Sequence, residues 1–417
     1  MADFHQPRFL PTIHRLGRPG LIGAHTADVH LTRTQASGLS TTLVLPALAQ
    51  ELETTAFPRM LRLLSGTPLI GRVIVVLGHA SERQHADAER LLRNVRIPAS
   101  LVRLDDPAVT AITKALDKQG VAIQPHGKGH ACWMGLCTAL AGQGSDVIAM
   151  HDCDIESYTP AMVSRLLAPL VIPARPYDFA KGFYARVTTR MYGRVTRLLV
   201  APLLRALQAV DVPSRLPAFL ADCRYPLAGE VAFSRALATE LPIHGGWGLE
   251  IGTLAEVHRR QARYRACQVD IADEYEHRHR PIGTESDSAG LTTMVEQIVA
   301  TLLDALRRDG VAIDSRLMRY VVAHHRHEVQ HLLDAYEADA AINGLSYDAA
   351  MEAHTAGQFV AALERCVASG CPSVPAHPSW TEVRSIAPRA AECFADLAET
   401  SRLDKPRYVD EPAVEVA

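Results

Sequence analysis

Two acidic residues, separated by one residue, follow a short apolar segment of the chain. Asp152 and Asp154 come directly after residues 147–150, whose side chains are all apolar, as in a buried strand. Carboxylate oxygens suit Mg²⁺ or Mn²⁺, so one carboxylate can bind a divalent ion while the other holds a sugar hydroxyl or a bound water. An acidic turn that caps the next helix is the simpler alternative, because a DxD triplet alone is weakly specific.

A lysine between two glycines precedes a predicted helix upstream of this acidic pair. In Gly127-Lys128-Gly129, flexible backbone amides and one cation meet where the helix begins, which suits a diphosphate. The GxxxxGK[ST] spacing of a Walker loop is absent. A turn with a solvated lysine is the alternative, and the phosphate interpretation gains its weight from the combination with Asp152 and Asp154.

A basic, histidine-rich cluster follows the apolar segment 266–272. Residues 275–281 read YEHRHRP and contain His277 and His279. Imidazole nitrogen is a common metal ligand, which makes this cluster a candidate partner of Asp154. For each residue taken alone, an exposed basic loop is the alternative.

Strand-like and helix-like segments alternate around these residues. Apolar strands are predicted at 41–48, 72–78, 99–104 and 147–150, with helices at 81–95 and 107–118. The alternation predicts an α/β fold with a Rossmann-like, mostly parallel sheet whose ligands bind beyond the carboxyl ends of the strands. The pattern becomes helical from about Leu291. We therefore expect an N-terminal arm at 1–37, an α/β domain at 38–288 and a helical C-terminal extension at 289–417.

Composition limits the classes of partner. The chain has 417 residues, a formal net charge of -3 and 48% hydrophobic residues, so no overall charge favours nucleic acid or a membrane surface. Its eight cysteines form no CxxC pair or regular disulfide framework, which favours a reducing cytoplasm. No apolar run has the length of a signal sequence or a membrane span, so a soluble protein is expected.

A second motif with chemical potential lies in the helical part of the chain. Residues 327–331 read HEVQH, which is formally the HExxH pattern of zinc metallohydrolases, with His327 and His331 as ligands and Glu328 as base. The chain is rich in histidine and no third-ligand motif follows, which favours a structural role for this segment. A non-catalytic protein that binds nucleotide sugars is a further alternative.

Several separated motifs occur in the order PAL, GKG, DxD, GRVT, PLAGE, GWGLEIG and HRHRP. In this order the chain resembles the retaining GT-A glucosyl-3-phosphoglycerate synthases and their mannosyl-3-phosphoglycerate relatives. The resemblance covers about residues 41 to 285, and YDFAKGFYAR and EADAAINGLSYD extend it into the helical extension. It implies a GT-A glycosyltransferase domain at 38–288.

The resemblance also implies roles for individual residues on the donor side. Lys128 would contact the donor phosphates, Asp154 with His277 would bind Mg²⁺ or Mn²⁺, and Asp152 and Glu250 would hold the sugar. Lys128, Asp152 and Glu250 would thus carry the chemistry. The nucleotide and sugar would be bordered by Pro46, Ala47, Leu48, Gln50 and Leu227 to Gly229. GWGLEIG could otherwise be a glycine-bounded core strand with a solvent-facing Glu250.

On the acceptor side, the resemblance assigns the phosphate or carboxylate of the acceptor to one motif. Arg194 and Thr196 would receive it, because a guanidinium offers paired donors to such groups. GRVT could otherwise be an ordinary helix start. The acceptor residues implied are Gly193, Arg194, Val195, Thr196 and His279.

The sequence departs from the family pattern at three places. Ala49-Gln50 stands where the family usually has Asn-Glu after PAL, which alters the contacts expected for the base and ribose. Gly78-His79-Ala80 replaces an acidic or serine-bearing turn, and His279 replaces an Asn on the acceptor side.

The function implied is transfer of glucose from UDP-glucose to D-3-phosphoglycerate, with retention of the anomeric configuration. GDP-mannose as donor, or unphosphorylated glycerate as acceptor, is the alternative. We also expect a homodimer in the cytoplasm that serves compatible-solute synthesis. The partners expected are thus a nucleotide-sugar donor and a small anionic acceptor.

Overall fold

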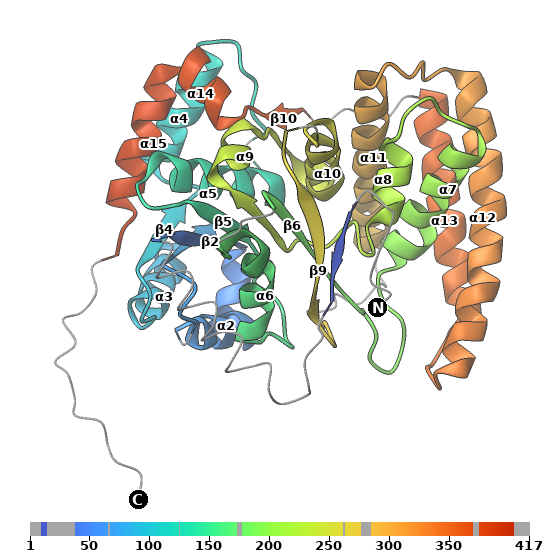
Figure 1. The fold of residues 1–417 in the computed structure, drawn as a ribbon, viewed down its shortest axis with the longest axis horizontal. Coiled ribbons are helices and arrows are strands. Elements are labelled where there is room, and N and C mark those ends of the chain that lie inside the picture. The colour runs from blue at the N-terminus through green and yellow to red at the C-terminus, as the bar shows by residue number, and fades with distance from the viewer. Residues whose placement is uncertain are drawn as a thin grey trace, which may run out of the picture.

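The computed structural model describes residues 10–14, 38–65, 67–124, 126–172, 177–261, 263–276, 285–369 and 375–403. An eight-stranded sheet forms the centre of the molecule (Figure 1). Its strands, in spatial order, are β1 (Thr12–Ile13), β9 (Ala266–Ala272), β6 (Phe179–Tyr184), β7 (Val231–Ser234), β5 (Val147–Met150), β2 (Thr41–Ala47), β3 (Arg72–Leu77) and β4 (Ala99–Arg103). Neighbouring strands are parallel except at β7, which is antiparallel to both β5 and β6.

The central strands are buried along almost their whole length because helices cover both faces of the sheet. Successive side chains of β2 point to opposite faces. Leu43 and Leu45 pack in one core with α2 (Ala56–Leu64), α3 (Glu82–Arg93) and α6 (Pro160–Val171). Val44 packs in the other core with α4 (Pro107–Asp117) and α5 (Lys128–Ala141). The predicted mostly parallel α/β sheet is confirmed.

The order of the strands creates a crevice between β2 and β5. From β2 the chain proceeds to β3 and β4 on one side, whereas β5 and β7 continue the sheet on the other. Such a switch point leaves room for a ligand beyond the carboxyl ends of the two strands. The segments that emerge there are residues 46–48 after β2 and residues 151–154 after β5, and His151 N donates to Val44 O at 3.2 Å.

The helical part of the chain divides into two groups (Figure 1). Helices α11 (Glu285–Arg308), α12 (Ser315–Ile342) and α13 (Ala349–Ser369) lie beside α7 (Ala201–Ala209) and α8 (Leu216–Asp222). Helices α14 (Trp380–Ile386) and α15 (Pro388–Thr400) instead return to the sheet, where α15 packs against α4 and α5. Between these groups, β10 (Ala376–His377) pairs antiparallel with β8 (Ile243–His244). The boundaries 1–37, 38–288 and 289–417 stay a prediction.

Two local expectations need correction. GWGLEIG is not a core strand: η3 (Gly246–Gly248) leads into α10 (Leu249–Arg259), and Glu250 lies in the first turn of that helix. Cys366 is disulfide-bonded, which the scattered cysteine spacing did not predict. The free cysteines among the described residues are Cys132, Cys137, Cys153, Cys223, Cys267 and Cys393. No described helix is long and apolar enough to cross a membrane.

Candidate active site

Lys128 lies between two carboxylates in the crevice. Its Nζ atom is 2.6 Å from Asp152 Oδ1 and 3.0 Å from Glu250 Oε1. Burial lowers the pKa of Lys128, but the charges of Asp152 and Glu250 outweigh burial and raise this pKa well above its ordinary value. Lys128 is therefore a permanent cation. The structure thus brings together the three residues predicted to carry the chemistry, from the start of α5, the end of β5 and the start of α10.

Two glycines allow Lys128 to enter this site. Gly127 has a positive φ of 92°, a conformation that favours glycine, and it directly precedes α5. A Cβ added at Gly129 would lie 2.2 Å from the carbonyl oxygen of His244, so only glycine lets α5 approach that segment so closely. The GKG motif therefore places Lys128 at the first position of a helix N-terminus, which suits a negatively charged ligand.

The turn at residues 225–229 closes the site from the other side. A Cβ added at Gly229 would lie 2.6 Å from Asp152 Oδ1 and 2.8 Å from Lys128 Nζ. The buried ammonium of Lys181 donates to Ala228 O and supports the turn from below. Burial lowers the pKa of Lys181 to about 8, against the opposing charges of Glu250 and Glu230.

Asp154 has the environment expected of a cation ligand. Burial and then the charge of Asp152 raise the pKa of Asp154 to about 7, with Glu51 adding to the effect and Lys128 opposing it. A bound cation would relieve this crowding of negative charge. Glu51 Oε2 is buried and has no hydrogen-bond partner among the described residues, so Glu51 is a further oxygen ligand available nearby. These hard oxygen donors fit Mg²⁺ or Mn²⁺.

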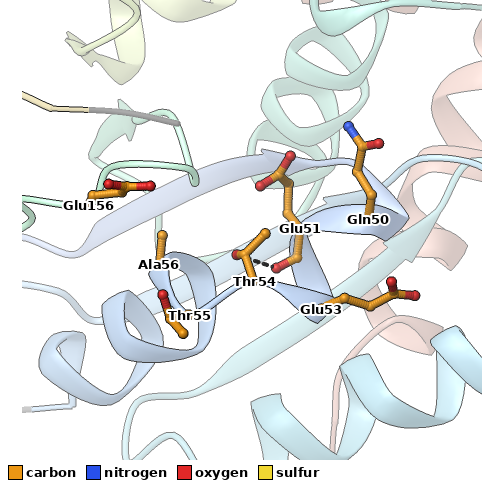
Figure 2. Close-up of a pocket in the computed structure, with 7 residues that line it drawn as sticks. All are labelled: Gln50, Glu51, Glu53, Thr54, Thr55, Ala56 and Glu156. Atoms are coloured by element: carbon orange, nitrogen blue, oxygen red, sulfur yellow. Dashed lines mark hydrogen bonds between the residues drawn. The ribbon is translucent and has the colours of Figure 1, made fainter. Parts of the chain in front are cut away.

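A pocket of about 400 Å³ lies between η1 (Ala49–Glu53) and Glu156 of the loop after β5 (Figure 2). Figure 2 shows Gln50 and Glu51 on one side and Glu156 across from them. Gln50, predicted near the nucleotide, therefore borders a real cavity. Leu48, with 53% of its surface exposed, is an apolar platform at the same edge, whereas Ala47 is buried in β2. The pocket residues are Gln50, Glu51, Glu53, Thr54, Thr55, Ala56 and Glu156.

The predicted ligand His277 and the predicted acceptor residue His279 lie outside the described residues. The segment that leads to them is fixed beside the DxD motif. Glu156 N donates to Glu276 O at 2.7 Å, and Glu276 N donates to Ser157 Oγ at 3.0 Å. Among the described residues, no three His, Cys, Asp or Glu side chains form a complete metal site. The role of His277 stays a prediction.

The predicted acceptor motif forms a second charged site. Gly193 has a φ of 72° and precedes η2 (Val195–Val200), a short π-helix that continues into α7. Arg194 Nε lies 2.6 Å from Glu352 Oε1. The hydroxyl of Thr196 is buried and has no hydrogen-bond partner among the described residues, so it is available to a ligand. The side chain of Val195 is partly buried and packs against the core. Only the backbone of Val195 would therefore contact an acceptor.

The turn 225–229 connects the two charged sites. A Cβ added at Gly193 would lie 2.9 Å from Tyr225 Oη, and Arg186 donates to the same hydroxyl at 3.0 Å. Tyr225 therefore contacts the acceptor motif, while Gly229, four residues further, contacts Lys128 and Asp152. Leu227, predicted to line the sugar pocket, is partly buried within this turn.

Within the part of the chain that the structure describes, the HEVQH segment does not complete a metallohydrolase site. His327 and His331 lie on the exposed surface of α12, with their Nε2 atoms 3.0 Å apart. Glu328 instead forms an ion pair with Arg205 of α7 at 3.3 Å. No third ligand joins the histidines among the described residues.

Four polar residues of these sites were missed from the sequence: Glu51, Lys181, Glu230 and Glu352. Glu230 is fully buried and accepts hydrogen bonds from Tyr184 Oη at 2.9 Å and Tyr275 Oη at 2.6 Å. Lys181 and Glu230 stand inside YDFAKGFYAR and PLAGE, so their presence within family-like segments was an available signal. Glu352 follows EADAAINGLSYD closely, but nothing in its neighbourhood marks it as buried.

The chain is similar to curated glucosyl-3-phosphoglycerate synthases. It is 33% identical to that of Persephonella marina, over 87% of this chain and 90% of the relative. It is 31% identical to that of Methanococcoides burtonii, over 86% of this chain and 90% of the relative. No protein-family model matches the chain.

Solved structures of the Mycobacterium tuberculosis glucosyl-3-phosphoglycerate synthase have a similar fold. One, in complex with Mn²⁺, UDP-glucose and phosphoglyceric acid, has a TM-score of 0.53 and 28% identity, covering 73% of this chain and 90% of that one. Another, with Mg²⁺ and UDP, has a TM-score of 0.51 and 27% identity, covering 73% and 88%.

The reversed strand β7, the crevice at β2 and β5, and the lysine between two carboxylates define a nucleotide-sugar-dependent glycosyltransferase of the GT-A fold. The curated relatives identify the family within this class of glycosyltransferases. The chain belongs to the glucosyl-3-phosphoglycerate synthase family, because relatives at 33% and 31% identity match it along most of both chains.

Proposed function

We propose that the protein transfers glucose from UDP-glucose to D-3-phosphoglycerate, forming glucosyl-3-phosphoglycerate and UDP. The observation that carries this proposal is the position of Lys128 between Asp152 and Glu250 at the crevice, 2.6 and 3.0 Å from their oxygens. The ammonium of Lys128 can bind the diphosphate, and the carboxylates of Asp152 and Glu250 can accept hydrogen bonds from the sugar hydroxyls. One cluster can therefore bind both parts of the donor. The relatives' names and the ligands of the M. tuberculosis structures support the choice of substrates.

Donor binding uses the ends of two strands. Leu48 and Gln50 border the nucleotide, and Lys128 contacts the diphosphate from the N-terminus of α5. Asp152 and Glu250 accept hydrogen bonds from sugar hydroxyls once Lys128 turns toward phosphate. Asp154 with His277 would hold Mg²⁺ or Mn²⁺, whose charge offsets the negative charge on the diphosphate.

Transfer requires the bond between the anomeric carbon and the diphosphate oxygen to break while the acceptor hydroxyl oxygen bonds to the same carbon and its proton passes to the departing diphosphate. Lys128 neutralises charge that develops on the departing UDP, and this stabilisation is larger in the transition state than in the ground state. Arg194 and Thr196 position the acceptor by its phosphate or carboxylate. The anomeric configuration is retained in this proposal, as the family resemblance implies.

The decisive experiment is a matrix of donors and acceptors with the purified protein. UDP-glucose, GDP-mannose and ADP-glucose are each crossed with 3-phosphoglycerate and glycerate, with and without Mg²⁺ or Mn²⁺, and products are identified by mass and by NMR of the anomeric proton. Product from UDP-glucose and 3-phosphoglycerate alone supports the proposal. Product formed only from GDP-mannose would show that the donor assignment is wrong, and product formed only with glycerate would show that the acceptor assignment is wrong. UDP binding without turnover indicates a non-catalytic binding protein.

We also propose a homodimer in the cytoplasm whose product serves compatible-solute synthesis. Apolar side chains exposed on the described helices α12 and α13, among them Tyr320, Ile342 and Met351, are candidates for the dimer contact. Light scattering coupled to size exclusion measures the mass of the assembly, and a mass of one chain would refute the dimer.

A further inference from the structure

Glu352 of the helical extension is buried against the acceptor motif. Only 4% of its side chain is exposed, although it lies in the first turn of α13, near the surface end of that helix. Its Oε1 atom is 2.6 Å from Arg194 Nε and its Oε2 atom is 2.9 Å from Arg197 Nη2. A buried carboxylate is costly unless it is paired, so the two guanidiniums account for its position.

Arg197 is held rigidly and can serve as an anchor. Its Nε donates to Tyr192 O at 2.9 Å, and its guanidinium lies over the Tyr336 ring at 4.8 Å from the centroid. With 12% of its side chain exposed, Arg197 is more enclosed than Arg194, which is 25% exposed. Arg197 therefore forms an ion pair with Glu352 Oε2, and Glu352 Oε1 accepts a hydrogen bond from Arg194 Nε.

This arrangement leaves Arg194 able to bind a second anion. Glu352 occupies the Nε side of the guanidinium, and the terminal Nη atoms have no hydrogen-bond partner among the described residues. Two guanidiniums share one carboxylate, so this three-residue cluster keeps excess positive charge. The fork geometry of guanidinium lets one edge contact a protein carboxylate while another binds a ligand phosphate or carboxylate. The hydroxyl of Thr196, two residues further, is also available.

The start of α13 is itself fixed to the acceptor side of the molecule. Ser346 N donates to Thr189 O at 2.9 Å, and Ser346 Oγ contacts the same carbonyl at 3.1 Å. Asp348 Oδ1 accepts from Met351 N at 2.9 Å and caps α13, which begins at the next residue, Ala349, with Glu352 in its first turn. The position of Glu352 is therefore set by the backbone of the extension, and not by a flexible side chain alone.

We propose that Glu352 is a positioning residue for the acceptor: it holds the Arg194 guanidinium by its Nε side so that the terminal nitrogens bind the acceptor anion. This inference rests on the proposed function, since it takes 3-phosphoglycerate as the anion. It assigns the helical extension a part in the reaction, because α13 supplies the group that orients an acceptor-binding residue of the sheet domain.

The test measures 3-phosphoglycerate binding by calorimetry in the presence of UDP and Mn²⁺, together with steady-state kinetics, for Glu352→Gln, Glu352→Ala and Glu352→Asp. In Glu352→Gln and Glu352→Ala, we expect the acceptor Kd and KM to rise roughly tenfold, because Arg194 must then be immobilised on binding. The Kd for UDP should change less than twofold. Glu352→Asp should restore part of the affinity, because it keeps one charged contact. Glu352→Gln keeps the shape of the side chain and carries the test if Glu352→Ala does not fold.

The matched control is Glu364→Gln on the same helix, where Glu364 pairs with Arg326 of α12 at the exposed surface. This variant should leave all binding constants unchanged. In an Arg194→Ala background, Glu352→Ala should change the acceptor Kd by less than a further factor of two, since the two residues act as one unit.

Several results overturn the inference. Wild-type or tighter acceptor binding by Glu352→Gln would show that Glu352 does not position Arg194 or competes with the acceptor. Equal losses of UDP and acceptor binding, with a lower Tm, would show a structural role only. If the wild-type protein binds 3-phosphoglycerate but forms no product, the proposed function fails while the Kd comparison still decides the role of Glu352. Absence of binding to the wild-type protein overturns the acceptor assignment itself.

Discussion

Lys128 Nζ and Asp152 Oδ1 lie 2.6 Å apart, although one residue begins a helix and the other follows a strand. The ion pair therefore holds the lysine in the proposed donor site, and Lys128 turns from the carboxylates to the phosphate when the donor binds. Lys128→Met keeps the length of the side chain and removes its charge. We expect kcat to fall about a hundredfold, as when one preorganised electrostatic donor is removed from an active site. Progress curves with UDP-glucose measure this loss. Activity within threefold of wild type would contradict the role of Lys128.

Asp154→Ala should abolish the stimulation of turnover by Mn²⁺ while leaving the fold intact. The reason is that Asp154 is the proposed ligand, whose hard carboxylate oxygens suit Mn²⁺ and whose negative charge the cation would offset. His277→Ala should have the same effect if the family resemblance assigns the second ligand correctly. Titration of Mn²⁺ by EPR reports metal affinity without turnover, and circular dichroism checks the fold. Unchanged metal affinity in both variants would refute this site.

Gly229→Ala should inactivate the enzyme without unfolding it. The added methyl group would lie 2.6 Å from Asp152 Oδ1 and 2.8 Å from Lys128 Nζ, so these side chains must move. We expect kcat/KM for UDP-glucose to fall at least about tenfold, since small displacements of positioning groups are costly. Gly357→Ala in α13 is the matched control, because an added Cβ there meets no atom within 4 Å. Equal activity of the two variants would show that the turn tolerates a side chain.

Arg194→Ala should raise the acceptor KM strongly and leave donor affinity nearly unchanged. A charge-assisted hydrogen bond contributes roughly 1.5 to 3 kcal/mol, which corresponds to a change of about ten- to a hundredfold. His279→Asn should have a smaller effect, concentrated below about pH 7, where imidazole carries charge. Kinetics with each substrate varied in turn separates the two constants. An unchanged acceptor KM in Arg194→Ala would require another anion site.

Three buried histidines should make the protein less stable in acid. Burial, followed by neighbouring charged groups, lowers the pKa of His130 and of His244 to about 4 and that of His377 to about 3. Their folded-state pKa values lie below the unfolded value of about 6.5, so their stabilising contribution is present above pH 6.5 and is lost as pH falls toward 4. The Tm should therefore decrease by several degrees between about pH 7 and pH 5.

His377→Phe isolates one of these contributions. The His377 ring stacks on Trp133 at 5.0 Å, and neither ring nitrogen has a hydrogen-bond partner among the described residues, so phenylalanine can replace it. The variant should lose less stability on acidification than wild type. An identical pH dependence of the Tm would show that other groups control acid unfolding.

The sequence predicts the sheet and the donor cluster well because both leave local signals. Strands buried on both faces, such as β3, are continuous apolar runs, and the expected helix start at Ser81 has a capping box with Gln84. Lys128 stands out because glycines flank it. Glu352 could not be found in this way, because its partner Arg194 is 158 residues distant and a helical acid is usually exposed. Glu250 was selected through the GWGLEIG motif. The alternative interpretation of that motif as a core strand was wrong, because Glu250 lies in the first turn of α10.

The turn 225–229 lies between the proposed donor site at Lys128 and the proposed acceptor site at Arg194. At one end Tyr225 packs on Gly193, and at the other Gly229 leaves space for Lys128 and Asp152. A change in this turn that widens one of the two proposed sites would also displace residues of the other. In the proposed arrangement, substitutions that admit a new acceptor are therefore expected on the opposite side, where Arg194 meets Glu352 of the helical extension, because changes there leave Lys128 and Asp152 in place.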